Sequence, residues 1–228
     1  MLQKTNSLAI YTVTSLVLAW LSYLYWDIRI ASYFYSNNTP PVIEWFKFIT
    51  EFGEGVYWIV PPGLLYLLYR LSRAYVVPLD SLRQLLEYRR DSLMRLAGFV
   101  SLSALTSGFL VNVFKLIFAR FRPVELFQND NYGFSWFDTG YRMASFPSGH
   151  SATALGVAFA LALVFPRYRL VILALGILVL SSRIVLTAHF LSDTIVGAYV
   201  GVLTSLWLYR RFYGEITATA RPLVDSTN

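Results

Sequence analysis

The residues best suited to chemistry are the chain's two histidines, His150 and His189. His189 precedes Asp193 by four residues, which places both side chains on one face if a helix spans them. An imidazole that donates one N–H to a carboxylate can act as a nucleophile through its other nitrogen, because the carboxylate fixes the tautomer and stabilises the cation that forms. His189 is therefore the candidate nucleophile, Asp193 its orienting partner, and His150 the candidate general acid and base.

Three cations are expected near these histidines. Lys115 and Arg122 are separated by about two helical turns, so both are predicted on one side of a helix end, and Arg183 lies near the end of a later apolar run. Ser148 and Gly149 begin another run, where the free N–H groups of a helix start can bind an anion. This set favours phosphate or diphosphate over a carboxylate. The cations also supply the charge that a metal would give to phosphoryl transfer, so no metal or other cofactor is expected.

Composition places these residues at a membrane. The 228 residues are 56% hydrophobic and 14% charged, with a mean hydropathy of +0.52. A soluble core of this size cannot hide so much apolar surface, and the proportions rule out a disordered or nucleic-acid-coating chain. The absence of cysteine removes disulfides, thiolate nucleophiles and cysteine-ligated metals.

Apolar runs predict an all-α polytopic membrane protein, a six-transmembrane-helix bundle that forms a single domain over residues 1–228. The expected spans are residues 8–26, 56–71, 96–118, 148–165, 170–186 and 190–209. The second span is short and contains Pro61-Pro62-Gly63, which is expected to kink or thin it.

A further helix is expected in the first outer loop, within residues 44–54. Trp45, Phe48, Ile49 and Phe52 recur there at helical spacing, with charged residues between them. The pattern is typical of a helix lying in the membrane interface, and equally of an amphipathic helix packed on the bundle.

Loop charges orient the bundle. Six crossings place both termini on one side, and most of the 19 Lys and Arg residues then lie on that side, above all in residues 70–95. The positive-inside rule makes that side cytoplasmic. Lys115, Arg122 and Arg183 then share the outer side with both histidines, which favours one common site over separate residues that reach the headgroups or serve structural roles.

With these residues in place, the sequence resembles the type 2 phosphatidic acid phosphatase superfamily. The signature of that family reads Lys-x6-Arg-Pro, then Pro-Ser-Gly-His, then Ser-Arg-x5-His-x3-Asp. Its positions here are Lys115, Arg122, Pro123, Pro147, Ser148, Gly149, His150, Ser182, Arg183, His189 and Asp193. The resemblance covers the second half of the chain, and the first 95 residues match in general layout only.

The resemblance implies an integral membrane phosphatase of a bacterial inner membrane whose active site faces the periplasm. It implies a phosphohistidine at His189 held by Asp193, and a general acid at His150. The implied phosphate-binding residues are Lys115, Arg122, Ser148, Gly149 and Arg183. The implied partners are the bilayer and a membrane lipid phosphate, with phosphatidic acid, phosphatidylglycerophosphate, undecaprenyl diphosphate and the 1-phosphate of lipid A as candidates.

Two other functions would use the same residues. One is phosphotransfer to a second lipid instead of water, and the other is non-catalytic transport of a lipid phosphate. Substrate choice is expected to lie outside the signature, in residues 124–146, which are rich in aromatic residues. This segment is either a lid that recognises a headgroup or an aromatic belt at the membrane interface.

Overall fold

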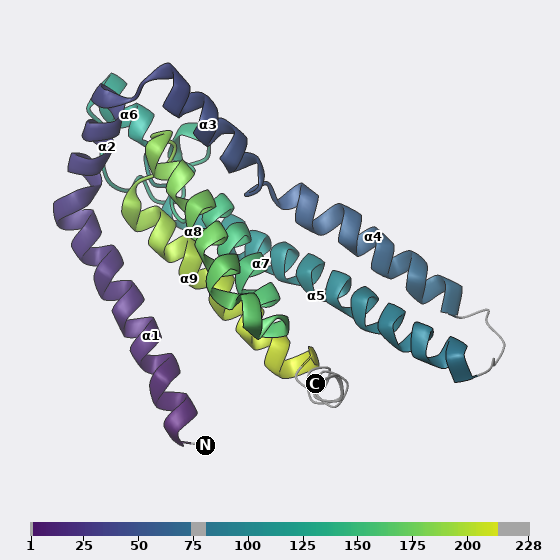
Figure 1. The fold of residues 1–228 in the computed structure, drawn as a ribbon. Coiled ribbons are helices and arrows are strands. Elements are labelled where there is room, and N and C mark those ends of the chain that lie inside the picture. Colours follow the sequence, from purple (N-terminus) through teal and green to yellow (C-terminus); the bar gives the residue numbers. More distant parts are fainter. Residues whose placement is uncertain (1, 74–80, 214–228) are drawn as a thin grey trace.

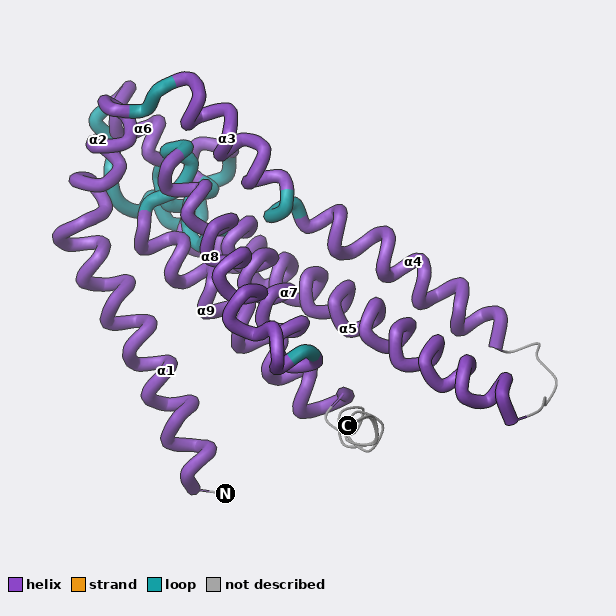
Figure 2. The backbone as a smooth tube through the Cα atoms, viewed as in Figure 1, coloured by secondary structure: helices purple, strands orange, loops and turns teal. Residues whose placement is uncertain are grey.

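The computed structural model describes residues 2–73 and 81–213, which are almost entirely helical (Figures 1 and 2). The α-helices are α1 (Leu2–Leu21), α2 (Asp27–Asn37), α3 (Pro40–Glu51), α4 (Gly55–Arg73), α5 (Ser81–Phe118), α6 (Pro123–Asn129), α7 (Gly149–Val164), α8 (Arg169–Val185) and α9 (Leu191–Leu208). Short π and 3-10 turns are η1 (Ser22–Trp26), η2 (Tyr141–Met143), η3 (Pro166–Tyr168) and η4 (Tyr209–Tyr213). In these described ranges the only β pairing is an isolated bridge between Arg120 and Phe134. The predicted all-α class is confirmed.

The long helices alternate in direction along the bundle (Figure 1). Helix α1 leads to the end where α2, α3 and α6 lie, α4 runs away from that end, and α5 returns to it. Helix α7 lies in the centre and packs against α5, α8 and α9. The turns that join α5 to α7 and α8 to α9 therefore meet at the same end of the molecule as α2 and α3.

Small residues let α9 pack directly on α7. A Cβ atom added to Gly201 would collide with the carbonyl oxygen of Ala152, and one added to Gly197 would collide with that of Ser148. Close backbone contact between small residues is the usual way that helices associate in a membrane. It brings the first turns of both helices together, and the backbone N–H of Ser148 donates to the carbonyl oxygen of Asp193 at 3.0 Å.

Four described segments are long and apolar enough to cross a membrane: Leu8–Asn37, Arg90–Phe118, Pro166–Val185 and Leu191–Phe212. Their outer faces carry large exposed apolar side chains such as Phe109 (65% exposed) and Leu170 (75% exposed). The chain is an integral membrane protein, because such surfaces need lipid as their solvent. The expected second and fourth spans are the helices α4 and α7, which are not among the four; α7 is a shorter apolar helix of 16 residues.

Helix α4 continues through Pro61 and Pro62. The hydroxyl of Ser101 on α5 donates to the carbonyl oxygen of Ile59, just before the two prolines, at 2.8 Å. Gly63 leaves room for this contact, because a Cβ there would lie 2.6 Å from the Ser101 oxygen. Helix α5 thus supplies a hydrogen bond where proline weakens the helical pattern.

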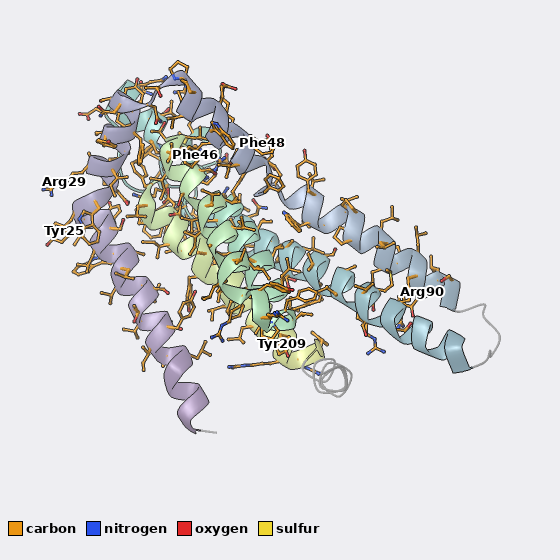
Figure 3. All side chains as sticks on the ribbon, in the orientation of Figure 1. Tyr25, Arg29, Phe46, Phe48, Arg90 and Tyr209 are labelled. Atoms are coloured by element: carbon orange, nitrogen blue, oxygen red, sulfur yellow. The ribbon has the colours of Figure 1, made fainter. Side chains whose placement is uncertain are left out.

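The first helical segment extends beyond the predicted end at residue 26. A π-helical turn, η1, joins α1 to α2 and places the side chains of Ser22 and Asp27 in the interior. Tyr25 and Arg29 instead project away from the bundle (Figure 3). Such turns are often found at functional positions in helices.

The helix predicted within residues 44–54 is α3. It begins at Pro40, packs along α8, and contacts the buried cluster around Val179 through Ile49. Trp45 and Phe48 are 67% and 62% exposed. The helix is therefore packed on the bundle, and its position in a membrane interface stays a prediction.

Candidate active site

The predicted ionisable residues lie together at one end of the bundle. Lys115, Arg122 and Arg183 interact electrostatically with one another and with His150. Arg122 and Arg183 also act on His189. The three parts of the signature thus form one positively charged cluster.

Arg122 reaches this cluster from a loop. We expected Lys115 and Arg122 on one helix, and this is wrong: α5 ends just before Ala119, whose positive φ of 42° turns the chain. The Arg122 side chain is held by the carbonyl oxygens of Tyr141, at 2.8 Å from Nε, and Ala144, at 3.3 Å from Nη2. Its guanidinium lies 4.1 Å from the centre of the Tyr141 ring. Arg122 is 7% exposed and fixed by the loop that precedes α7.

The start of α7 forms the second part of the site. Ser148 is the N-cap residue, and its hydroxyl accepts hydrogen bonds from the hydroxyl of Ser151 at 2.9 Å and from the Ser151 backbone at 3.4 Å. A Cβ added to Gly149 would lie 3.9 Å from Nζ of Lys115. The ammonium group of Lys115 therefore lies beside the N-terminal turn of α7, an arrangement suited to an anion.

His189 lies in the turn between α8 and α9. The carbonyl oxygen of Arg183 accepts from the backbone N–H groups of Ala188 and His189, at 3.0 and 3.2 Å. The turn therefore holds His189 close to Arg183. We expected His189 and Asp193 on one helix face, but α9 begins only after Phe190. Asp193 instead caps the helix, because its Oδ2 accepts from the Phe190 N–H at 2.9 Å.

The imidazole of His189 is oriented mainly by Ser145. Its Nδ1 lies 2.8 Å from the Ser145 carbonyl oxygen and 3.7 Å from Oδ2 of Asp193. The latter separation exceeds a hydrogen bond, so the expected direct bond to Asp193 is wrong. Ser145 connects the two, since its hydroxyl donates to Asp193 Oδ2 at 2.6 Å. A carbonyl oxygen can only accept, so Nδ1 carries the proton and Nε2 keeps its lone pair.

Burial sets the charge of His189. The residue is 2% exposed. Burial lowers the pKa of His189 to about 4, and the positive charges of Arg122 and Arg183 act in the same direction. The imidazole is therefore neutral at pH 7, the state in which its nitrogen can attack phosphorus.

Two buried residues that the sequence did not predict for the site, Arg120 and Asp27, are linked to Asp193: Arg120 binds it directly, and Asp27 binds Arg120. Arg120 donates to Asp193 Oδ1 at 2.5 Å and to Asp27 Oδ2 at 2.8 Å, and all three side chains are 0% exposed. Signals for both were present. Arg120 is an additional cation within the Lys-x6-Arg-Pro segment, and Asp27 is a lone carboxylate at the end of an apolar run, which is costly unless paired.

The turn between α3 and α4 forms one wall of the site. Glu54 Oε1 lies 3.0 Å from Nε2 of His150, and the Thr50 hydroxyl accepts from Nη1 of Arg183 at 2.7 Å. Gly53 packs against the imidazole: a Cβ there would lie 2.9 Å from Cδ2 of His150. The segment predicted as an interfacial or bundle-packed helix is thus followed by a turn that, with Thr50 of the helix itself, contacts two of the site residues.

Two cavities flank this wall. One, of about 440 Å³, lies between the start of α4, α5 and α7, with Gly149, His150, Gly108 and Phe109 among its lining residues. The other, of about 520 Å³, lies between α3, α7 and α8. Its lining is apolar and includes Phe48, Ile49, Trp58, Leu161, Leu175 and Val179. Both cavities can accept hydrocarbon close to His150 or to the segment that contacts it.

The cluster can hold a phosphate group. Lys115, Arg122 and Arg183 supply positive charge, and the first turn of α7 supplies free N–H groups. Among the side chains that the structure describes, in residues 8–72 and 90–212, no three His, Asp or Glu side chains are arranged to hold a metal ion. The chemistry available from these side chains is transfer of a phosphoryl group to an imidazole.

Comparison with known proteins agrees with this geometry. The family model described as PAP2 superfamily matches residues 96–216, more than half of the chain, including every signature residue. The chain belongs to the PAP2 superfamily. This confirms the resemblance drawn from the signature, and it makes the chain a phosphatase, a phosphoric monoester hydrolase.

Two relatives of the chain are lipid A 1-phosphatases. The one from Rhizobium johnstonii is 31% identical over 186 residues, which cover 82% of this chain and 73% of that protein. The one from Rhizobium etli is 29% identical over 191 residues, which cover 82% of this chain and 77% of that protein. The similarity thus extends beyond the segment that carries the PAP2 signature.

Proposed function

We propose that this PAP2 protein hydrolyses the phosphate ester or diphosphate of a membrane lipid, through a phosphohistidine at His189. The observation that supports the proposal most is the orientation of this imidazole. Nδ1 donates to the Ser145 carbonyl, so the lone pair of Nε2 is available among the cations of the cluster. A neutral, buried and oriented imidazole beside a phosphate-binding cluster has the properties of a nucleophile.

In the first step, Nε2 of His189 attacks phosphorus and the bond to the lipid oxygen breaks. Lys115, Arg122 and Arg183 bind the non-bridging oxygens, where charge is spread in the transition state. His150 gives its proton to the departing lipid oxygen. The positive charge that develops on the His189 ring is stabilised by the Ser145 carbonyl and by the carboxylate of Asp193, at 2.8 and 3.7 Å from Nδ1.

In the second step, water attacks the phosphorus of phospho-His189. His150, now neutral, takes a proton from this water, and the bond from Nε2 to phosphorus breaks. Inorganic phosphate leaves and both histidines return to their first state. Glu54 Oε1 lies 3.0 Å from Nε2 of His150, so its carboxylate is placed to accept from that nitrogen when His150 is protonated.

The substrate is proposed to be a lipid phosphate because the site lies beside apolar cavities at the end of membrane helices. Among the candidates, the 1-phosphate of lipid A comes first, since both curated relatives act on that group by name. Phosphatidic acid, phosphatidylglycerophosphate and undecaprenyl diphosphate are the other candidates.

We further propose six membrane crossings, formed by α1, α4, α5, α7, α8 and α9, in a bacterial inner membrane. Cationic residues such as Arg70, Arg167 and Arg210 lie at or next to helix ends that point away from the site, and Arg90 lies in the half of α5 that is remote from it (Figures 1 and 3). The positive-inside rule then places these ends and both termini in the cytoplasm. The site faces the periplasm.

Phosphate release from purified protein tests the proposal. The protein in detergent micelles is given each of the four candidate lipids, and inorganic phosphate is measured, with His189→Asn as the inactive control. Release from at least one lipid that stops in His189→Asn supports hydrolysis. Binding without release would favour transport, and loss of lipid phosphate with its appearance on a second lipid would favour phosphotransfer.

A further inference from the structure

Arg120 connects two carboxylates that lie far apart in the chain. Its Nη1 donates to Oδ1 of Asp193 at 2.5 Å, and its Nη2 donates to Oδ2 of Asp27, 93 residues earlier, at 2.8 Å. None of the three side chains is exposed. A buried guanidinium with two separate carboxylate partners uses the planar fork of arginine, which lysine cannot reproduce.

Asp27 is held from several directions. Its Oδ1 accepts from the Ser22 hydroxyl at 2.8 Å and from the Ser192 backbone N–H at 2.9 Å, and its Oδ2 also accepts from the Ser192 hydroxyl. Ser22 belongs to the π turn η1, and Ser192 directly precedes Asp193. The first helical segment is thereby tied to the first turn of α9.

Aromatic rings enclose the guanidinium of Arg120. Its central carbon lies 4.6 Å from the ring centre of Phe190, 5.0 Å from that of Tyr23 and 5.4 Å from those of Tyr132 and Phe134. This enclosure excludes water from the ion pairs. Burial alone would lower the pKa of Arg120, but the carboxylates of Asp193 and Asp27 outweigh it and raise that pKa, so the side chain stays charged.

The second carboxylate matters for the charge near the nucleophile. If Arg120 paired with Asp193 alone, its positive charge would cancel the negative charge that stabilises a cation on His189. Because Asp27 shares the guanidinium, the three groups together keep a net negative charge. Asp193 can then act on His189, 3.7 Å away, while its other contacts hold the Ser145 carbonyl in place.

We infer that Arg120 and Asp27 are positioning residues for the phosphoryl-transfer reaction, which they assist by fixing Asp193 and, through Ser145, the imidazole of His189. The inference rests on the proposed function of His189. Neither residue touches the phosphate. The first helical segment, outside the signature of the family, thus contributes a residue on which turnover depends.

The test compares Asp27→Asn with wild type, using Asp91→Asn as the matched control. Asp91 is an aspartate of α5 hydrogen-bonded to Tyr69, in the half of that helix that is remote from the site. We expect kcat of Asp27→Asn, per folded molecule, to fall at least about tenfold with KM changed less than about twofold, as is usual for residues that orient reacting groups. The control should retain wild-type kcat.

Nitrogen NMR of ¹⁵N-histidine protein supplies a readout that a purely structural role would not move. Wild type should show His189 as the single Nδ1–H tautomer without substrate, and Asp27→Asn should show a mixture of tautomers. This readout needs no turnover. If wild type releases no phosphate from any lipid, the proposed function fails, whereas the tautomer still tests the positioning.

A kcat of Asp27→Asn within twofold of wild type, together with an unchanged tautomer, would overturn the inference. If Asp27→Asn does not fold, Ser22→Ala decides, because it removes one hydrogen bond of Asp27 and no charge. We then expect a several-fold lower kcat at unchanged KM. Wild-type kcat in Ser22→Ala would equally overturn the inference.

Discussion

The Nδ1 atom of His189 lies 2.8 Å from the carbonyl oxygen of Ser145. A backbone carbonyl that is itself fixed, through the Ser145 hydroxyl, to a buried carboxylate orients an imidazole as firmly as a side chain would. The carboxylate of Asp193 then contributes charge at 3.7 Å without accepting the proton directly. Two different residues therefore act on the His189 imidazole: the Ser145 carbonyl orients the ring, and the Asp193 carboxylate supplies negative charge near it.

The first prediction concerns the protonation of His189. Since burial lowers the pKa of His189 to about 4, the neutral ring should persist as pH falls from 7 to 5, with the proton on Nδ1. The chain contains two histidines, so its ¹⁵N-histidine NMR spectrum contains signals from two imidazoles. The signals that remain in His150→Gln belong to His189. A midpoint near the ordinary value of about 6.5, or a proton on Nε2, would contradict the assignment of His189 as a neutral nucleophile.

The second prediction concerns the general acid. His150→Gln should slow phosphate release from a lipid by about 10²–10⁴-fold, because the lipid alkoxide needs a proton to leave. For an aryl phosphate, whose acidic leaving group needs no proton, release of the phenol in a single turnover should slow much less than single-turnover cleavage of the lipid phosphate. Glu54→Gln should act in the same direction but more weakly, since Glu54 touches only the imidazole of His150, at 3.0 Å from Nε2, and is placed to pair with it when it is protonated.

The matched control for Glu54→Gln is Glu44→Gln. Glu44 is an exposed glutamate of α3 whose carboxylate pairs with Lys47 at 2.8 Å. It should leave both rates unchanged. Equal slowing of lipid cleavage and of phenol release in a single turnover of His150→Gln would mean that His150 binds the phosphate and does not protonate the leaving group.

The third prediction concerns the cavity between α4, α5 and α7. Gly108 lines this cavity, and a Cβ added there meets no atom within 4 Å, so Gly108→Leu should fill space without a clash. If the cavity holds the substrate's hydrocarbon chain, this variant should lower kcat/KM for a long-chain lipid phosphate about tenfold and leave a short-chain analogue within twofold, since buried chain length carries the binding energy. Leu110→Phe, on the same helix outside the cavity, is the control. Similar losses for both chain lengths would argue against the cavity as the chain site.

The spans were predictable where long apolar runs decide the structure. Helices α5 and α8 end at Phe118 and Val185, at or next to the predicted ends at residues 118 and 186. The position of Arg122 was not predictable in the same way. Its place outside the helix depends on the positive φ of Ala119 and on carbonyl groups of a later loop, which no local pattern reveals.

The site was predictable only in part for a similar reason. The signature residues lie within one part of the sequence and are of types suited to phosphate chemistry. Their types and spacing were therefore enough to predict them as site residues. Asp27, Arg120 and Glu54 belong to the site through contacts across the fold, such as the ion pair between residues 93 positions apart. The tautomer of His189 is likewise set by a backbone group, the Ser145 carbonyl, whose position is not encoded by its side-chain type.

The fourth prediction concerns the orientation in the membrane. The chain contains no cysteine, so single-cysteine variants label cleanly. Thr139, between α6 and α7 at the site end, and Tyr168, in η3 at the other end, are both exposed. A membrane-impermeant maleimide should label Thr139→Cys in intact spheroplasts and Tyr168→Cys only after lysis. The reverse pattern would place the site in the cytoplasm.

Trapping the phosphoenzyme tests the central claim most directly. In His150→Gln, an aryl phosphate should still phosphorylate His189, because its leaving group needs no proton, whereas hydrolysis of the intermediate should be slow without a general base. Mass spectrometry of the quenched protein should then find an acid-labile phosphoryl group on His189, absent from His189→Asn. Continued phosphate release with no phosphoryl group on His189, or with the group on another residue, would contradict the account.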